Sequence, residues 1–300
     1  MSDLTRPSAV CLGNFDGVHR GHRFLLSQTV RTAGELGLAP LCYTFEQHPS
    51  SVLRTATPLL TLPEERNTLL RECGVQPVVD DFSKICHMEP EEFFEEVLLH
   101  RLGAKAILCG DNHRFGRKAA GDTALLRRLC ERSGLQLSVI SPLSDNGRPI
   151  SSSWLRECME RGDMETAARL LGRYPSIEGE VIVGRRLGRG MGFPTINQRL
   201  SPQRVKPRRG VYAAILSIQG RQYMGALNIG IRPTIPGEES AETHILDFDG
   251  DLYGQTIKLQ LVHHLRDEVR FDSVEALRAQ VLADIERVRE MGRALLNSAH

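Results

Sequence analysis

The chain lacks the features that mark nucleic-acid-binding, membrane or disulfide-stabilised proteins. Aromatic residues make up only 5% of its 300 residues, so we expect no stacking platform for single-stranded nucleic acid. Its 38 Lys and Arg residues balance 37 Asp and Glu residues, which leaves no global field to attract nucleic acid or an anionic membrane. No apolar run approaches the length of a membrane span, and the first residues contain no apolar core of a signal peptide. We therefore expect a cytoplasmic protein that binds neither nucleic acid nor membrane.

The seven cysteines are also informative because none stands in a Cys-x-x-Cys pair. Their odd number and their scatter, with several inside apolar runs, predict reduced, mostly buried thiols. All seven precede residue 160, so the chain changes character partway along its length.

The first half alternates between strand-like and helix-like patterns. The strand-like runs are 9–15, 40–45, 75–79, 104–110 and 137–141, and the helical patterns between them are 22–36, 64–73, 90–102 and 122–133. Alternation of this kind predicts a parallel, doubly wound α/β sheet of the Rossmann-like class.

The second half has a different sequence pattern. A helical stretch from residue 151 to Leu171 ends at Gly172, and from Ile177 short strands with Gly-rich turns predict a small antiparallel β-barrel or sandwich. The strand-like runs include 244–248 and 256–262. The last segment, 274–296, carries an apolar helical stripe that should pack on this second domain. We place the two domains at residues 1–174 and 175–300.

A glycine-rich segment between the first strand and the first helix is the clearest candidate site. It comprises Gly13, Asn14, Phe15, Asp16, Gly17, Val18, His19, Arg20, Gly21 and His22. Its glycines permit a tight turn and close approach to the backbone, and a helix start favours bound phosphate. His19 and His22 are three residues apart, so both can face one ligand and stabilise charge on a transferring phosphate. A plain turn with a histidine cap is the alternative.

A second glycine-rich segment runs from Gly188 to Asn197 in the second half. Its loop contains Gly188, Arg189, Gly190 and Gly192, whose N–H groups could wrap a polyphosphate. Thr195 and Asn197 are two residues apart, so on an extended segment their oxygens point to the same side, as ligands of Mg²⁺ would. A hairpin with a polar tip is the alternative.

A third candidate is the run from Ala241 to Phe248. Glu242 and His244 share one strand face by the period of two, and Asp247 falls on the other. A carboxylate lining the barrel near Mg²⁺ and ATP could take a proton from an attacking hydroxyl. A surface Glu on an edge strand is the alternative.

Together these stretches resemble one family, the prokaryotic bifunctional riboflavin kinases/FMN adenylyltransferases, over nearly the whole chain. The motifs that carry the resemblance are Gly13–His22, the run from Tyr43 to Pro49, Arg114-Phe-Gly with Gly121-Asp, Ile150–Arg156, Gly192–Asn197, Gly210-Val-Tyr, Asn228–Thr234, Glu242–Phe248, Leu252-Tyr-Gly, and Leu265-Arg-Asp-Glu with Phe271.

The resemblance implies two phosphorus transfers. The C-terminal half would use ATP to phosphorylate riboflavin to FMN, with Thr195 and Asn197 on Mg²⁺, Glu242 as general base and the 188–192 loop over the phosphates. The N-terminal half would join FMN to the adenylyl group of a second ATP, giving FAD and pyrophosphate. There His19 and His22 would stabilise the transition state, and Ser152, Ser153 and Arg156 would bind phosphates. Flavin-binding residues would be Asn112, Arg114, Asn228 and Arg232.

The sequence also departs from the family pattern, at Asn112, His113, Ser153 and Trp154. All four positions belong to the half expected to transfer the adenylyl group. Two alternatives therefore stay open beside the bifunctional enzyme: a riboflavin kinase with a weak or inactive adenylyltransferase half, and a non-catalytic flavin or nucleotide sensor. We expect a monomer or a weak homo-oligomer.

Overall fold

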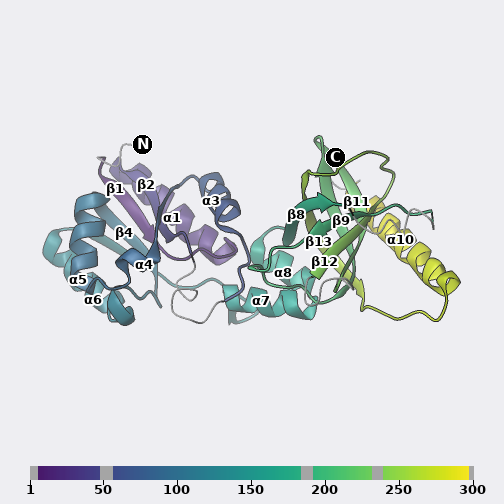
Figure 1. The fold of residues 1–300 in the computed structure, drawn as a ribbon. Coiled ribbons are helices and arrows are strands. Elements are labelled where there is room, and N and C mark those ends of the chain that lie inside the picture. The colour runs from purple at the N-terminus through teal and green to yellow at the C-terminus, as the bar shows by residue number, and fades with distance from the viewer. Residues whose placement is uncertain (1–5, 48–56, 184–191, 232–238, 297–300) are drawn as a thin grey trace. The chain divides into compact units, whose positions relative to one another are not determined.

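The structure is a computed structural model that describes residues 6–47, 57–183, 192–231 and 239–296. The chain divides into two compact units, Met1–Ser152 and Ser153–His300 (Figure 1). This division assigns helices 152–171 largely to the second unit, and the domain boundary near residue 174 stays a prediction.

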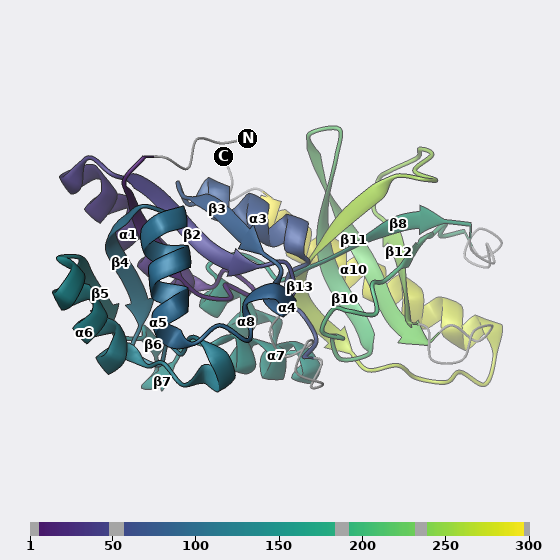
Figure 2. The same ribbon diagram turned by 60° about the vertical axis from the view of Figure 1, so that its left-hand side comes forward.

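The first unit contains a five-stranded parallel sheet (Figures 1 and 2). Its strands are β1 (Ser8–Leu12), β2 (Ala39–Phe45), β3 (Gln76–Asp80), β4 (Ala104–Gly110) and β5 (Gln136–Ile140), and their order is β3-β2-β1-β4-β5. A two-residue hairpin follows, β6 (Ser144–Asp145) with β7 (Arg148–Pro149). Every neighbouring pair in the large sheet is parallel, which confirms the α/β class.

Helices cover both faces of this sheet because consecutive residues of its central strands are apolar, so that each face carries apolar side chains. Val10 and Leu12 pack on one side against residues of the π-helical segment Phe93–Arg101 and α6, whereas Ala9 and Cys11 pack on the other against α1 and α3. The helices are α1 (Arg20–Leu36), α3 (Pro63–Glu72), α4 (Phe82–Ile85), α5 (Pro90–Glu92), which leads into Phe93–Arg101, the 3₁₀ turn Arg117–Ala119, and α6 (Thr123–Ser133).

The first strand is shorter than its apolar pattern predicts. It ends at Leu12, since Phe15 adopts a φ of 54° and leaves the extended conformation. The expected strand end at residue 15 was therefore wrong, and the extra residues form the turn that leads into α1.

The second unit begins with two helices, α7 (Ser152–Arg161) and α8 (Met164–Leu171). Gly162, with a φ of 78°, separates them, and Gly172 ends α8 in the left-handed conformation as expected. Both helices are tied to the strands that follow. The backbone N–H of Arg208 donates to the carbonyl of Met159 at 2.9 Å, and His263 Nδ1 lies 2.7 Å from Glu165 Oε1.

The rest of the second unit is a closed antiparallel barrel, which confirms the prediction. Its strands follow one another in the order β10-β11-β12-β9-β8-β13. They are β8 (Ser176–Ile182), β9 (Ile196–Arg199), β10 (Gly210–Ile218), β11 (Arg221–Ile231), β12 (Glu239–Ile245) and β13 (Thr256–Arg266).

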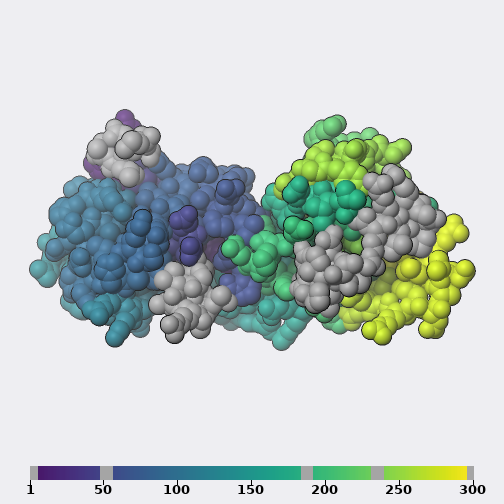
Figure 3. All heavy atoms as spheres, in the orientation of Figure 1, coloured from purple at the N-terminus to yellow at the C-terminus, as the bar shows by residue number. Residues whose placement is uncertain are grey.

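The C-terminal helix α10 (Val274–Leu296) packs on the outside of the barrel. Its Ile285 and Val288 join one apolar cluster with Val211 and Met224, and Gly292 lies so close to Met224 that a side chain there would collide. Even-numbered residues of β11 near Met224 therefore face outward. The other side of α10 lies at the surface (yellow in Figure 3). Leu282 of this helix is half exposed.

Strand β12 ends earlier than the expected run 244–248. Directly after β12, the Leu246 N–H still donates to the Met224 carbonyl of β11 at 2.8 Å, and the next residue, Asp247, has a φ of 56°. Asp247 thus belongs to a turn, where it forms an ion pair with Arg289 of α10 at 3.1 Å. The prediction that it lies on a strand face was wrong.

Two expectations from composition can be compared with the structure. All seven cysteines are free, and five of them are buried. Within the residues that the structure describes, no helix is both long and apolar enough to cross a membrane.

The two-sided packing of the parallel sheet makes a prediction for stability. Leu126 of α6 is fully buried in the cluster on one face, so we expect Leu126→Ala to lower the free energy of unfolding by about 2–5 kcal/mol. Leu36→Ala, the same change at a half-exposed position of α1, should cost less than about 0.5 kcal/mol. Urea denaturation followed by circular dichroism measures both, and equal losses would contradict the assigned core.

Candidate functional site

The turn between β1 and α1 is built by buried side chains. Phe15 and Val18 both have positive φ values, 54° and 41°, which are uncommon for residues with a Cβ and costly for a β-branched one. Phe15 is fully buried under the turn, and a side chain at Gly13 would crowd its ring, with the added Cβ 3.0 Å from Cε2. Strained backbone of this kind concentrates at functional sites.

Asp16 anchors this turn to a distant loop. Its Oδ1 accepts hydrogen bonds from the N–H groups of Leu60 and Thr61 at 3.0 and 3.1 Å, and the Thr61 hydroxyl accepts from the Gly17 N–H at 3.0 Å. The carboxylate is only 3% exposed. Asp16, predicted to bind nucleotide, therefore has a structural task in holding the turn.

The two histidines of the turn lie face to face. Their ring centroids are 3.6 Å apart with an interplanar angle of 15°, and the edge of the Phe15 ring supports His22 at 5.2 Å. His19 is the N-cap of α1, since its Nδ1 accepts from the His22 N–H at 3.2 Å. Because Nδ1 accepts, the His19 ring can donate only from Nε2. The histidine cap that the sequence offered as the alternative to a phosphate site is therefore present, and the phosphate role stays a prediction.

Burial determines the charge state of His22. It lowers the pKa of His22 well below 6.5, and repulsion from His19 lowers it further. The turn thus presents a neutral His22 imidazole at the positive end of a helix dipole, where it can donate a hydrogen bond to a phosphate.

The predicted flavin residues of the first unit follow the neighbouring strand. Asn112 and Arg114 are exposed residues just after β4, and β4 pairs with β1. In the order β3-β2-β1-β4-β5, the chain adds β2 and β3 on one side of β1 and then β4 and β5 on its other side. Ligands of such sheets bind outside the carboxyl ends of the two strands between which this change of side occurs, here β1 and β4. The topology therefore brings the histidine turn and residues 112–114 to one edge.

His113, one of the departures, is half-buried beside these residues. Its ring stacks on Phe115 with a centroid distance of 6.0 Å, and burial lowers its pKa to about 4. The ring is therefore neutral at physiological pH and preserves a flat, stacked surface at this position.

Ser152 also reaches the turn, because its hydroxyl donates to the Asp16 carbonyl at 2.9 Å. Ser153 and Arg156 follow on α7. That these three residues bind phosphate stays a prediction.

The candidate kinase residues form a row across three barrel strands. Asn228 of β11 pairs with Glu242 of β12, which pairs in turn with Asn197 of β9. Residues directly opposite in antiparallel strands share a face, so the three side chains are neighbours. They lie on the outer face, two residues along β11 from outward-facing Ala226, whereas Gln198 faces the interior. Glu242, expected to line the barrel, therefore does so on the outside of the barrel wall.

Accessibility changes along this row. Asn197 is 7% exposed, Asn228 is half-buried and Glu242 is exposed. A carboxylate that meets a substrate hydroxyl needs such access, while a buried carboxamide is held in one orientation.

His244, two residues beyond Glu242, fixes the segment before β9. Its Nδ1 lies 2.9 Å from the Pro194 carbonyl, and its ring contacts the edge of Phe193. This contact holds Thr195 at the start of β9 near the row. Sequence analysis assigned His244 no role, although its period-two spacing from Glu242 was visible. Gly192 has a φ of 91°, whereas Gly188, Arg189, Gly190 and Arg232 lie outside the described residues.

The donors at the β9 end of this row suit a cation that is not fully enclosed by protein. Thr195 and Asn197 offer a hydroxyl and an amide oxygen, and Mg²⁺ takes its remaining ligands from water and substrate phosphates. In the described part of the chain no group of three or more His, Cys, Asp or Glu residues could hold a metal.

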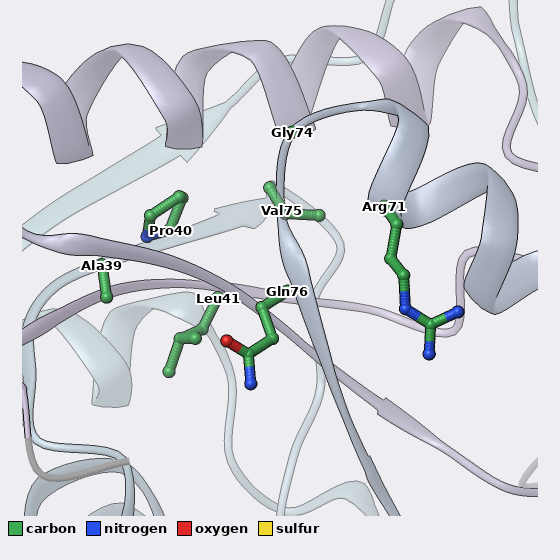
Figure 4. A pocket seen from close by; sticks show the side chains of 7 residues that line it. All are labelled: Ala39, Pro40, Leu41, Arg71, Gly74, Val75 and Gln76. Atoms are coloured by element: carbon green, nitrogen blue, oxygen red, sulfur yellow. The ribbon is translucent and has the colours of Figure 1, made fainter. Parts of the chain in front are cut away.

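A shallow hollow of about 440 Å³ lies elsewhere in the first unit (Figure 4). It is lined by Ala39, Pro40, Leu41, Arg71, Gly74, Val75 and Gln76. Since β2 begins at Ala39 and β3 at Gln76, the hollow is at the amino ends of the strands. Ligands of parallel sheets bind at the opposite ends, so we assign it no role in catalysis.

Two protein families match the chain in separate regions. Residues 2–154 match the FAD synthetase family and residues 171–292 match the riboflavin kinase family.

Relatives match over almost the whole chain. A bifunctional riboflavin kinase/FMN adenylyltransferase of Pseudomonas fluorescens is 35% identical over 95% of this chain and 93% of its own length. The protein of the same name from Escherichia coli strain K12 is 36% identical over 93% of this chain and 91% of its own. A solved structure described as a macrolide-efflux protein from Streptococcus pneumoniae has a TM-score of 0.86 and 30% identity, covering 94% of both chains.

The depressed pKa of His22 predicts a pH dependence of stability. Below pH 6.5 the unfolded chain binds a proton at His22 that the folded chain does not bind. The free energy of unfolding therefore carries no penalty from His22 above pH 6.5 and decreases as the pH falls below it. We expect His22→Asn to reduce the decline in Tm between about pH 7 and about pH 5. Thermal melts across this range measure it, with the exposed His100→Asn as control. Wild-type and His22→Asn curves with equal slopes would contradict the assignment.

Proposed function

The chain belongs to the family of bifunctional riboflavin kinases/FMN adenylyltransferases, and on this basis we propose how its residues divide the two reactions. The C-terminal half is a riboflavin kinase and the N-terminal half an FAD synthetase. In the first reaction the γ-phosphoryl group of ATP passes to a riboflavin hydroxyl, giving FMN and ADP. In the second, an FMN phosphate oxygen attacks the α-phosphorus of ATP, and pyrophosphate leaves.

For the kinase, the row of Asn197, Glu242 and Asn228 carries the proposal. Glu242, exposed at the centre of the row, takes the proton of the attacking hydroxyl. Thr195 and Asn197 hold Mg²⁺, which when bound neutralises charge on the ATP phosphates. Asn228, beside the base, and Arg232 bind the flavin, and the 188–192 loop covers the nucleotide.

For adenylyl transfer, the stacked histidines carry the proposal. Their rings donate hydrogen bonds to the α-phosphate as its negative charge develops, and the turn with Ser152, Ser153 and Arg156 holds the phosphates. Asn112 and Arg114, at the adjacent strand end, bind FMN. Such transfers depend mainly on positioning and charge neutralisation, so no covalent enzyme intermediate is required. A monomeric or weakly associated state remains part of the proposal.

Purified protein incubated with riboflavin, Mg²⁺ and ATP tests the division, with flavin products separated over time. We expect FMN to form first and FAD to follow. Accumulation of FMN without FAD would support a kinase with an inactive adenylyltransferase half, and absence of both products would support a sensor.

Glu242→Gln removes the proposed base while preserving shape. We expect FMN formation to fall by about a hundredfold or more, while FAD formation from supplied FMN is unchanged. Glu180→Gln, at an exposed position of β8, is the matched control and should leave both rates intact. If both reactions fell together in a well-folded Glu242→Gln protein, the assignment of Glu242 to one half would be wrong.

His19→Asn separates catalysis from capping, because Asn is a good N-cap but lacks an imidazole. We expect this variant to lose adenylyl transfer by about a hundredfold and to preserve riboflavin phosphorylation. An unchanged rate of riboflavin phosphorylation in the same protein would show that the variant is folded. Normal FAD formation by His19→Asn would show that His19 acts only as the cap.

A further inference from the structure

A buried ion pair joins the last barrel strand to the C-terminal helix. Arg266, at the end of β13, donates from Nε to Asp284 Oδ2 at 2.9 Å and from Nη2 to the same oxygen at 2.7 Å. Asp284 of α10 is 2% exposed, and Gln280 donates to its Oδ1 at 3.0 Å. Both carboxylate oxygens are therefore hydrogen-bonded, and the guanidinium is held in one orientation.

The same guanidinium holds the segment that leaves the barrel, residues 267–271. Arg266 Nη1 donates to the Asp267 carbonyl at 3.0 Å, and its Cζ lies 5.8 Å from the centre of the Phe271 ring. The segment is thus held at both of its ends by one side chain.

Within this segment, Glu268 lies against strand β11 at Gly230. A methyl group on Gly230 would overlap the Glu268 carboxylate and would lie 3.5 Å from Asn228 Nδ2. Gly230 and Asn228 share the outer face of β11, because they are two residues apart. The fixed segment therefore places a carboxylate next to the proposed flavin-binding carboxamide.

The ion pair and the proposed kinase site also belong to one row of paired residues. From Asn197, Glu242 and Asn228 the row continues to Val211 of β10, which pairs with Arg266 of β13. Val211 packs in the cluster under α10. The row is thus packed under α10 at Val211, and its other end, from Asn228 to Asn197, carries the proposed site.

We propose that Arg266 and Asp284 are positioning residues of the kinase reaction, which fix segment 267–271 so that Glu268 stands beside Asn228 and contacts the flavin. This inference rests on the proposed function of the row. The recognised chemistry is a neutral substrate with hydroxyl and N–H donors, to which a fixed carboxylate offers acceptors. The ion pair touches no substrate and acts through Glu268.

Single substitutions give the first test. In Asp284→Asn we expect the KM for riboflavin to rise about tenfold with a smaller change in kcat, because the displaced Glu268 weakens binding. FAD formation from supplied FMN, measured on the same protein, should be unchanged. Arg289→Gln, which breaks an exposed ion pair of the same helix, is the control and should alter neither reaction.

A single change leaves a buried charge unpaired, which destabilises the unit, so a paired replacement separates stability from positioning. Arg266→Met with Asp284→Leu fills the site with apolar groups of similar volume, which often preserves or improves stability. We expect this double variant to melt at or above the wild-type temperature and yet to show the raised KM for riboflavin. A wild-type KM in this folded variant would overturn the proposal.

The decisive measurement is the KM for riboflavin of the double variant that combines Glu268→Gln with Asp284→Asn. If the ion pair acts through Glu268, then Glu268→Gln raises the KM for riboflavin, and adding Asp284→Asn raises it little more. A purely structural ion pair would give effects on KM that multiply, and this result would overturn the inference. Failure of the proposed function is distinct, because the wild-type protein would then form no FMN.

Discussion

The pairing register of β9, β12 and β11 is the constraint on which the kinase half depends. A slip of β12 by one residue would turn Glu242 into the barrel and bring a buried neighbour out, because side chains alternate between the two faces. The register is supported from inside, where the Gln198 side chain donates to the carbonyls of Gly179 and Ile257 at 2.8 and 2.7 Å. A polar contact in the barrel interior thus helps to determine which groups meet on the exterior.

The adenylyltransferase half depends on a comparable constraint in a different fold. The buried carboxylate of Asp16 joins the strained turn after β1 to the loop at Thr61, and the turn then presents the stacked rings of His19 and His22. In both halves, the groups proposed to act on phosphate are held by residues that do not face the ligand. Such supporting contacts determine whether a reacting group stays within the small tolerance that catalysis allows.

Sequence patterns predicted the elements well and the supporting contacts poorly. Short apolar runs and helical patterns identified both sheets and α10, since burial of one or both faces of an element produces such patterns directly. The same period shows that Glu242 and His244 share a face, but it does not show which face is outside. The contact between Asp16 and Thr61 spans 45 residues, and no local pattern reports such a partner. The strand end at Leu12 was missed because Phe15 is apolar and yet adopts a positive φ.

Helices α7 and α8 bear on how this protein can be divided into modules. They include residues 155–170, which lie between the two family matches, yet Met164, Ala167 and Leu170 are buried within the second compact unit. A fragment that begins at residue 171 would lack these residues, would expose the barrel surface that α8 covers and would lose the partner of His263 at Glu165. In a chimera that exchanges the kinase modules of two relatives, the native core would therefore be preserved only if α7 and α8 are transferred together with the barrel from the same protein.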